Sequence, residues 1–353
     1  MTETMNRVRT VLVCLLVGIP MVASQALAQE GADCGGFERD IILADLDWDS
    51  VQFHTALAQY ILEEGYGCAT SAVPGTAVPM YQAMIRGDID VYMEVWNDQV
   101  PDFWAEAVAD GTVYELGVNF DDGIQGFYVP RYVIEGDSER GIEPMAPDLR
   151  SVSDLPRYAD VFRDPEQPQM GRFYNGVIGW QLEVINNVKL EAYGLTEHYT
   201  NFRPGTAVAL NSSLEGAYLR GEPWLGYQWE PTWVLGKLDM VLLEEPEYTE
   251  ECWEQVLANL DTPEEAEVAC AYPVSLTSVA AGQDLVENGP EEIVEFLGNY
   301  RTSAAITSAQ LAFMEENNAS ANDAAMNFLR TEPEIWTEWV TEEAAERLRA
   351  AIR

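Results

Sequence analysis

Short apolar runs alternate with amphipathic stretches along most of the chain. The run Ile-Ile-Leu-Ala at 41–44 has the length and the β-branched composition of a buried strand. The stretch that follows carries Phe53 and Leu57 at helical spacing, and we expect Asp49 or Ser50 to be the N-cap of that helix. The sequence therefore predicts a strand that leads through a polar turn into an amphipathic helix.

The same alternation recurs further along. We expect strands at 69–73, 89–95, 173–176 and 224–229, and helices at 76–85, 179–192 and 204–220. Strands that alternate with helices predict an α/β fold in which helices flank mostly parallel sheets.

Changes in composition divide the chain into two lobes. The region 132–170 is rich in Pro, Asp and Arg, and we interpret it as the beginning of a second lobe. The apolar run Met240 to Leu243 is interpreted as the return to the first lobe, where the C-terminal helices would pack. We thus expect lobe 1 at 29–131 and 233–353, lobe 2 at 132–232, and a two-strand hinge with crossings near 128–132 and 231–239.

The first 28 residues have the pattern of a secretory signal peptide. Two arginines precede the apolar run 11–23, and Ala26-Leu27-Ala28 forms a small-residue cleavage site. That run is shorter than the roughly 20 residues that a membrane-spanning helix needs. We expect export to the periplasm and a mature chain that begins near Gln29.

Cysteine usage fits an exported protein. Beyond the leader, the chain contains Cys34, Cys68, Cys252 and Cys270. An even number in an oxidising compartment predicts two disulfides. Four cysteines allow three pairings, and proximity in sequence favours Cys34 with Cys68 and Cys252 with Cys270. Because there is no C-x-x-C and there are two histidines, we expect no metal site and no cofactor.

The overall composition excludes several classes of protein. A formal net charge of −41 argues against nucleic acid and anionic membranes as partners. Ten tryptophans and 47% hydrophobic residues exclude a disordered chain. The chain has neither a Walker-type phosphate loop nor a convincing Ser/His/Asp or Cys/His set. We therefore expect a monomeric binding protein for a small molecule and no catalytic activity.

Four tryptophans occupy the same kind of position in the predicted elements. Trp48, Trp96 and Trp229 each follow a predicted strand, and Trp180 begins a predicted helix. Ligands of open α/β sheets bind at the carboxyl ends of strands, so we expect the four side chains to meet in the cleft between the lobes. For any single tryptophan, core packing is the alternative interpretation. Four tryptophans in the same kind of position favour a ligand-binding site. Indole faces attract a cation that cannot donate hydrogen bonds, such as trimethylammonium.

A second group would hold the other end of such a ligand. The backbone N–H groups of Gln181 and Leu182 lie in the first turn of the helix after Trp180, where an anion is favoured. Four further side chains are weaker candidates for the same site: Asp49, Glu94, Tyr128 and Glu230. The three acids would attract a ligand with a net positive charge, and the alternative is that they are ordinary solvated side chains. Tyr128 would contribute to the site, and the alternative is that it packs in the core.

Five segments, in the same order along the chain, resemble the glycine betaine, proline betaine and choline binding proteins of ABC importers. They are Trp48-Asp49-Ser50, Glu64 to Gly67, Ala83 to Trp96, Gly126 to Pro130 and Trp229 to Trp233. The resemblance implies a type II periplasmic binding protein whose two lobes close on the solute, with a permease and an ATPase at the inner membrane as partners. It also implies that Trp96, Trp180 and Trp229 box the cation, with Trp48 matching a cage residue of a different branch, and that Gln181 and Leu182 receive the carboxylate.

Two departures from the family pattern leave the ligand open. Val100 stands where one branch has a histidine, and Gln125 stands where the choline branch has a tyrosine. We expect a zwitterion with a methylated onium group, glycine betaine first, with proline betaine and dimethylsulfoniopropionate in the same class. Choline or carnitine is the alternative ligand, and a periplasmic sensor or an enzyme acting on betaines is the alternative class of protein.

Overall fold

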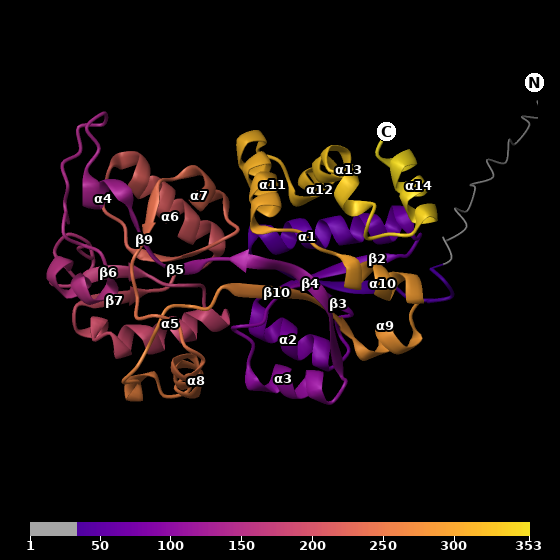
Figure 1. Ribbon diagram of the computed structural model, residues 1–353, viewed down its shortest axis with the longest axis horizontal. Coiled ribbons are helices and arrows are strands. Elements are labelled where there is room, and N and C mark those ends of the chain that lie inside the picture. The colour runs from indigo at the N-terminus through magenta and orange to yellow at the C-terminus, as the bar shows by residue number, and fades with distance from the viewer. Residues whose placement is uncertain (1–33) are drawn as a thin grey trace, which may run out of the picture. The chain divides into compact units, whose positions relative to one another are not determined.

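The computed structural model describes residues 34–353, so the predicted signal peptide at 1–28 lies outside the described residues. No helix within the described part of the chain is long and apolar enough to cross a membrane. The described residues form two five-stranded sheets, each flanked by helices. This arrangement, visible in Figure 1, confirms the two-lobed α/β fold that the sequence predicts.

The sheet of lobe 1 has the strand order β2-β1-β3-β10-β4. Its strands are β1 (Ile41–Leu46), β2 (Thr70–Gly75), β3 (Val91–Trp96), β4 (Val113–Gly123) and β10 (Ser275–Gly282). Its helices are α1 (Asp49–Tyr60), η1 (Ile61–Gly65), α2 (Ala77–Ile85), α3 (Asp102–Ala109), α9 (Gln283–Asn288), α10 (Glu291–Asn299), α11 (Ala304–Asn317), α12 (Ala321–Thr331), α13 (Pro333–Trp336) and α14 (Glu342–Ala351). Figure 1 shows α1 and α11 to α14 on one side of the sheet and α2, α3 and α9 on the other. The C-terminal helices therefore pack on lobe 1, as expected.

The sheet of lobe 2 has the strand order β7-β6-β8-β5-β9. Its strands are β5 (Gln125–Pro130), β6 (Gly171–Tyr174), β7 (Tyr199–Phe202), β8 (Gly226–Trp229) and β9 (Met240–Leu242). Its helices are α4 (Arg131–Glu135), η2 (Val152–Tyr158), α5 (Gln181–Ala192), η3 (Leu195–Glu197), α6 (Ala207–Arg220), α7 (Trp233–Lys237), α8 (Glu250–Ala258) and η4 (Pro263–Glu265). In Figure 1, α4, α6 and α7 lie on one side of this sheet and α5 and α8 on the other.

Both sheets are mixed, which corrects the expectation of mostly parallel sheets. In lobe 1, β1 runs parallel to β2 and β3, whereas β10 runs antiparallel to β3 and β4. In lobe 2, β6 runs parallel to β7 and β8, whereas β5 runs antiparallel to β8 and β9. In each sheet one strand runs opposite to the others, β10 in lobe 1 and β5 in lobe 2, and each of these strands begins at a point where the chain passes between the lobes.

The crossings between the lobes also differ from the expected ones. β4 ends at Gly123 and β5 begins at Gln125, so the chain enters the second sheet before residue 132. The interpretation of Met240 to Leu243 as a return to lobe 1 is wrong, because β9 pairs with β5 in lobe 2. The chain returns with β10, whose first residue Ser275 pairs with Gly123. The two crossings therefore lie side by side.

Two disulfides join the predicted cysteine pairs. Cys34 bonds to Cys68, which links the segment before β1 to the turn that follows η1. Cys252 on α8 bonds to Cys270 in the segment that leads to β10.

Candidate functional site

A small pocket is lined by residues of both lobes. Lobe 1 contributes Trp48, Ala77, Tyr81, Trp96 and Gln99, and lobe 2 contributes Trp180, Gln181, Leu182, Tyr227 and Trp229. The four tryptophans that the sequence singles out thus meet at one place, together with the two residues of the predicted anion site. That these residues bind a ligand stays a prediction at this point.

The sheet topology explains why the tryptophans meet. In lobe 1, Trp48 follows β1 and Trp96 ends β3, and these strands are parallel neighbours whose carboxyl ends share one edge. In lobe 2, Trp229 ends β8, and Trp180 lies in the connection that follows β6, the parallel neighbour of β8. Each sheet therefore presents its carboxyl edge to the pocket.

The ring of Trp180 stands nearly perpendicular to the rings of Trp48 and Trp229. The centroid of Trp180 lies 5.6 Å from that of Trp48 at 77° and 5.3 Å from that of Trp229 at 88°. Tyr227 stacks on Trp229 at 5.8 Å and 18°, and Trp96 meets Phe120 edge-on at 5.8 Å. Indole rings in different orientations therefore surround the pocket, and Tyr227 covers one face of Trp229.

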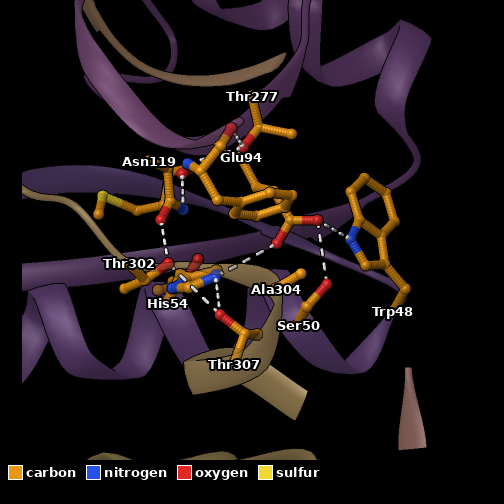
Figure 2. A network of polar contacts seen from close by, with 12 residues as sticks. Trp48, Ser50, His54, Glu94, Asn119, Thr277, Thr302, Ala304 and Thr307 are labelled. Carbon is orange, nitrogen blue, oxygen red and sulfur yellow. Dashed lines mark hydrogen bonds and ion pairs between the residues drawn. The ribbon is translucent and has the colours of Figure 1, made fainter. Parts of the chain in front are cut away.

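Glu94 lies behind two of the tryptophans rather than in the pocket wall. Its Oε1 accepts hydrogen bonds from Trp48 Nε1 at 2.8 Å, from Trp96 Nε1 at 3.0 Å and from Ser50 Oγ at 3.0 Å. Figure 2 shows Glu94 with Trp48 and Ser50 on one side and His54 on the other. The N-cap of α1 is Trp48, not Asp49 or Ser50 as expected, so the Ser50 hydroxyl is free to bond Glu94 from inside the first turn.

The Glu94 carboxyl is fully buried beside neutral groups. Burial raises its pKa to about 7, and the hydrogen bonds from Trp48, Ser50 and Trp96 limit that rise. Its Oε2 has no hydrogen-bond partner within residues 34–353 and lies 3.7 Å from His54 Nε2. Burial lowers the pKa of His54 to about 3, so this imidazole is neutral at pH 7.

Trp180 also makes a contact across the two lobes. Its Nε1 donates to Asp47 Oδ1 at 2.7 Å, and the carbonyl of Gly179 accepts from Val78 N at 3.3 Å. Gly179 has φ +99°, and a Cβ there would lie 2.6 Å from Thr76 Oγ1. Glycine is therefore required both by the backbone and by the close approach to α2, and the lobes are closed over the pocket.

A buried amide links the pocket to the crossings between the lobes. Gln125 Oε1 accepts from Gln99 Nε2 at 2.9 Å and from the Tyr227 hydroxyl at 2.6 Å. Its Nε2 donates to Asp98 Oδ2 at 3.0 Å and to Ser275 Oγ at 2.5 Å. Burial raises the pKa of Asp98 to about 7. The Gln125 side chain thus joins two residues of the pocket wall to the point where β10 begins.

The first turn of α5 points two free donors toward the pocket lining. The N–H groups of Gln181 and Leu182 have no acceptor within the described part of the chain, as is usual at a helix start. α5 is 12 residues long, so its aligned peptide dipoles favour a negative group at this end. The predicted anion site is therefore available in the closed pocket.

Three weaker candidates lie elsewhere. Asp49 lines a separate cavity beside α11, and burial, followed by the charge of Glu315, raises its pKa. Tyr128 is buried in β5, and the half-buried Glu230 donates its N–H to the Ile124 carbonyl at 2.7 Å. None of these three is among the described residues that line the pocket.

The sequence does not single out three of the lining residues, Ala77, Tyr81 and Gln99, and core or hinge packing is the favoured interpretation of a fourth, Tyr227. Gln99 follows Trp96 by three residues, and Tyr227 shares a face of β8 with Trp229 because side chains of a strand alternate. The strand-end argument that selects the tryptophans would have found both. Ala77 and Tyr81 come from α2, and no sequence feature sets them apart from ordinary core residues.

Comparison with known proteins identifies the family. The family described as the substrate binding domain of ABC-type glycine betaine transport systems matches residues 39–331. The trimethylamine N-oxide-binding protein of Pelagibacter ubique (strain HTCC1062) is 22% identical over 303 residues, which cover 85% of this chain and 90% of that protein.

Two solved structures show the same fold. The glycine betaine/L-proline-binding protein ProX of Borrelia burgdorferi matches with a TM-score of 0.68 and 19% identity, covering 88% of this chain and all of that one (100%). Lactococcal OpuAC, in a closed conformation complexed with glycine betaine, matches with a TM-score of 0.62 and 16% identity, covering 86% and 100%.

Proposed function

The chain belongs to the family of substrate-binding domains of ABC-type glycine betaine transport systems, and we propose that it captures a small methylated onium zwitterion for import. Its role is that of a binding component and not of an enzyme, which follows from the family. The observation that carries the proposed ligand class is the meeting of Trp48, Trp96, Trp180 and Trp229, from both lobes, around one pocket.

The tryptophans would hold the onium end of the ligand. A methylated ammonium or sulfonium group cannot donate hydrogen bonds, so its attraction to the protein must come from ring faces and from charge. Each desolvated face contributes on the order of 1–2 kcal/mol, so three or four faces give roughly 3–8 kcal/mol. Micromolar affinity needs about 8 kcal/mol, which leaves a modest remainder for the other end of the ligand.

The N–H groups of Gln181 and Leu182 would hold the anionic end. Glycine betaine, proline betaine and dimethylsulfoniopropionate each have a carboxylate within a few bonds of the onium centre, whereas choline does not. Trimethylamine N-oxide, for which the Pelagibacter ubique relative is named, has its negative oxygen directly on the nitrogen and belongs to the same class. Choline remains the second candidate, because Glu94 has no lysine or arginine partner among the described residues and would balance a net cation. Carnitine is the other alternative, a zwitterion whose carboxylate lies farther from its trimethylammonium group than that of glycine betaine.

Export and assembly complete the proposal. We propose that residues 1–28 are cleaved, that the mature protein acts in the periplasm as a monomer, and that it delivers its ligand to a permease and an ATPase. The leader features described above and the family support this. Mass spectrometry of the exported protein is expected to give an N-terminus at Gln29, and light scattering is expected to give one chain per particle.

A calorimetric panel tests the ligand class. We expect glycine betaine, proline betaine, dimethylsulfoniopropionate and trimethylamine N-oxide to include the tightest ligand, with choline and carnitine weaker. Choline binding at least tenfold tighter than every zwitterion, about 1.4 kcal/mol, would remove the anion role of Gln181 and Leu182. Failure of every onium compound to bind would refute the proposed function.

A further inference from the structure

One buried oxygen collects three donors behind the tryptophan pocket. The indole N–H groups of Trp48 and Trp96 and the hydroxyl of Ser50 all point at Glu94 Oε1. Two aromatic walls that come from different strand ends are thus fixed by one side chain. We propose that Glu94 is the positioning residue of this site, holding the two indoles in place and supplying the negative charge that balances a bound onium group.

Several other buried carboxylates have a cationic partner, whereas Glu94, like Asp98, has none among the described residues. Glu245 lies 2.7 Å from Lys189, and both side chains are almost fully buried. Asp164 is bonded to Arg172, and Asp90 to Arg39. A buried carboxylate normally has such a partner, because an unpaired charge is costly to bury. Glu94 has no lysine or arginine partner among residues 34–353, so the ligand itself is the fitting counter-charge.

The groups that face Glu94 from the surrounding elements are neutral near pH 7. His54 on α1 has its pKa lowered to about 3 by burial, and its Nδ1 lies 2.7 Å from the Tyr300 hydroxyl. Burial, with a contribution from Glu94, raises the pKa of Tyr300 well above its usual value. The same holds for Tyr92 on β3, where Tyr81 contributes more than Glu94. Glu94 is therefore the group of this cluster that titrates near neutrality.

This arrangement couples ligand binding to a proton. A bound cation favours the ionised carboxylate and therefore lowers the pKa of Glu94, which is about 7 without ligand. Below that pH, binding must release a proton, and affinity falls as the pH decreases. Above it, the carboxylate is already ionised and affinity levels off. The inference rests on the proposed function, since it assumes an onium ligand in the tryptophan pocket.

The variant Glu94→Gln separates charge from shape. Its single amide oxygen can still accept from all three donors, because these converge on one oxygen of Glu94. The ligands are choline and its uncharged carbon isostere 3,3-dimethylbutan-1-ol, measured by calorimetry between pH 5.5 and 8.5. We expect the variant to bind choline about tenfold more weakly, with less than a threefold change for the isostere. The loss should be greatest above pH 7, and the affinity of the variant should depend less on pH than that of the wild type, with Asp98 as the remaining group near the pocket whose pKa is about 7.

Glu115→Gln is the matched control. Glu115 also accepts an indole N–H, from Trp104 at 3.0 Å, but neither residue lines the pocket. We expect this variant to bind choline as the wild type does. An equal loss for choline and the isostere in Glu94→Gln, or no loss for either, would overturn the proposal.

A measurement without ligand keeps this inference separate from the proposed function. The indole N–H resonances of Trp48 and Trp96, assigned with Trp→Phe variants, are expected to shift together with a midpoint near pH 7, and to stay constant in Glu94→Gln. If the wild type binds no onium compound, the proposed function fails, and this titration still decides whether Glu94 holds the indoles. Indole signals that ignore pH in the wild type would overturn the positioning role.

Discussion

The hydrogen bond from Trp180 to Asp47 predicts a specific change in ligand release. Asp47→Ala removes the acceptor but leaves the indole of Trp180 in the pocket. A hydrogen bond to a charged group contributes about 1.5–3 kcal/mol, and because Asp47 is only half-buried we take the lower value. About 1.5 kcal/mol corresponds to roughly a tenfold loss of affinity.

The loss should appear in the dissociation rate. The 2.7 Å contact joins the two lobes, so it exists only when they are closed, after the ligand has entered. Stopped-flow tryptophan fluorescence with glycine betaine is expected to show dissociation about tenfold faster and association nearly unchanged. Trp180→Phe keeps an aromatic face and loses the same hydrogen bond, so the double variant should lose less than the sum of the two single losses.

Asp45→Ala is the control for this experiment. Asp45 is also a half-buried acid at the end of β1, two residues before Asp47, and it makes no hydrogen bond to lobe 2 within the described chain. The Asp45→Ala variant should release the ligand at the wild-type rate. Wild-type dissociation in Asp47→Ala, or additive losses in the double variant, would refute the reasoning that this bond holds the lobes closed.

Three further predictions concern the pocket, a disulfide and acid stability. Trp96→Ala, Trp180→Ala and Trp229→Ala should each weaken binding by about 1–2 kcal/mol or more in calorimetry while the fold survives, and wild-type affinity in any two of them would exclude the predicted cage. Cys252→Ser opens a loop of sequence separation 18 and should lower the free energy of unfolding by about 3 kcal/mol in urea titrations, so an unchanged midpoint would contradict a stabilising role. Because the pKa of His54 is lowered to about 3, the unfolded chain binds a proton there that the folded chain does not, and stability falls as the pH decreases below about 6.5. The stability difference between wild type and His54→Gln should therefore shift against the wild type from pH 7.5 to pH 5, and a constant difference would show that folding does not lower the pKa of His54.

The sequence predicts well where a residue's place in an element decides its position. Trp48, Trp96 and Trp229 meet because strand ends of a sheet share an edge, and this rule needs only the strand assignments. The two disulfides follow from the number and spacing of the cysteines. Both arguments use local information, and the structure agrees with them.

The sequence predicts poorly where distant segments choose their partners. Met240 to Leu242 reads as a strand, but its pattern does not say that it pairs with β5 rather than with a strand of lobe 1. The strand 275–282 was not predicted, although it lies between β3 and β4 in the first sheet. The sequence names Glu94 as a weaker candidate but does not predict its contacts, because its three donors reach one oxygen only after β1, α1 and β3 have come together.

The position of Gln125 has a consequence for how cargo leaves the protein. Its amide bonds two residues of the pocket wall, Gln99 and Tyr227, and also Ser275, which pairs with Gly123 where the chain passes between the lobes. Gln99 belongs to lobe 1 and Tyr227 to lobe 2, so we expect the wall that this amide joins to come apart when the lobes open. Under the proposed function, a partner that separates the lobes would therefore also take apart the surface that holds the solute.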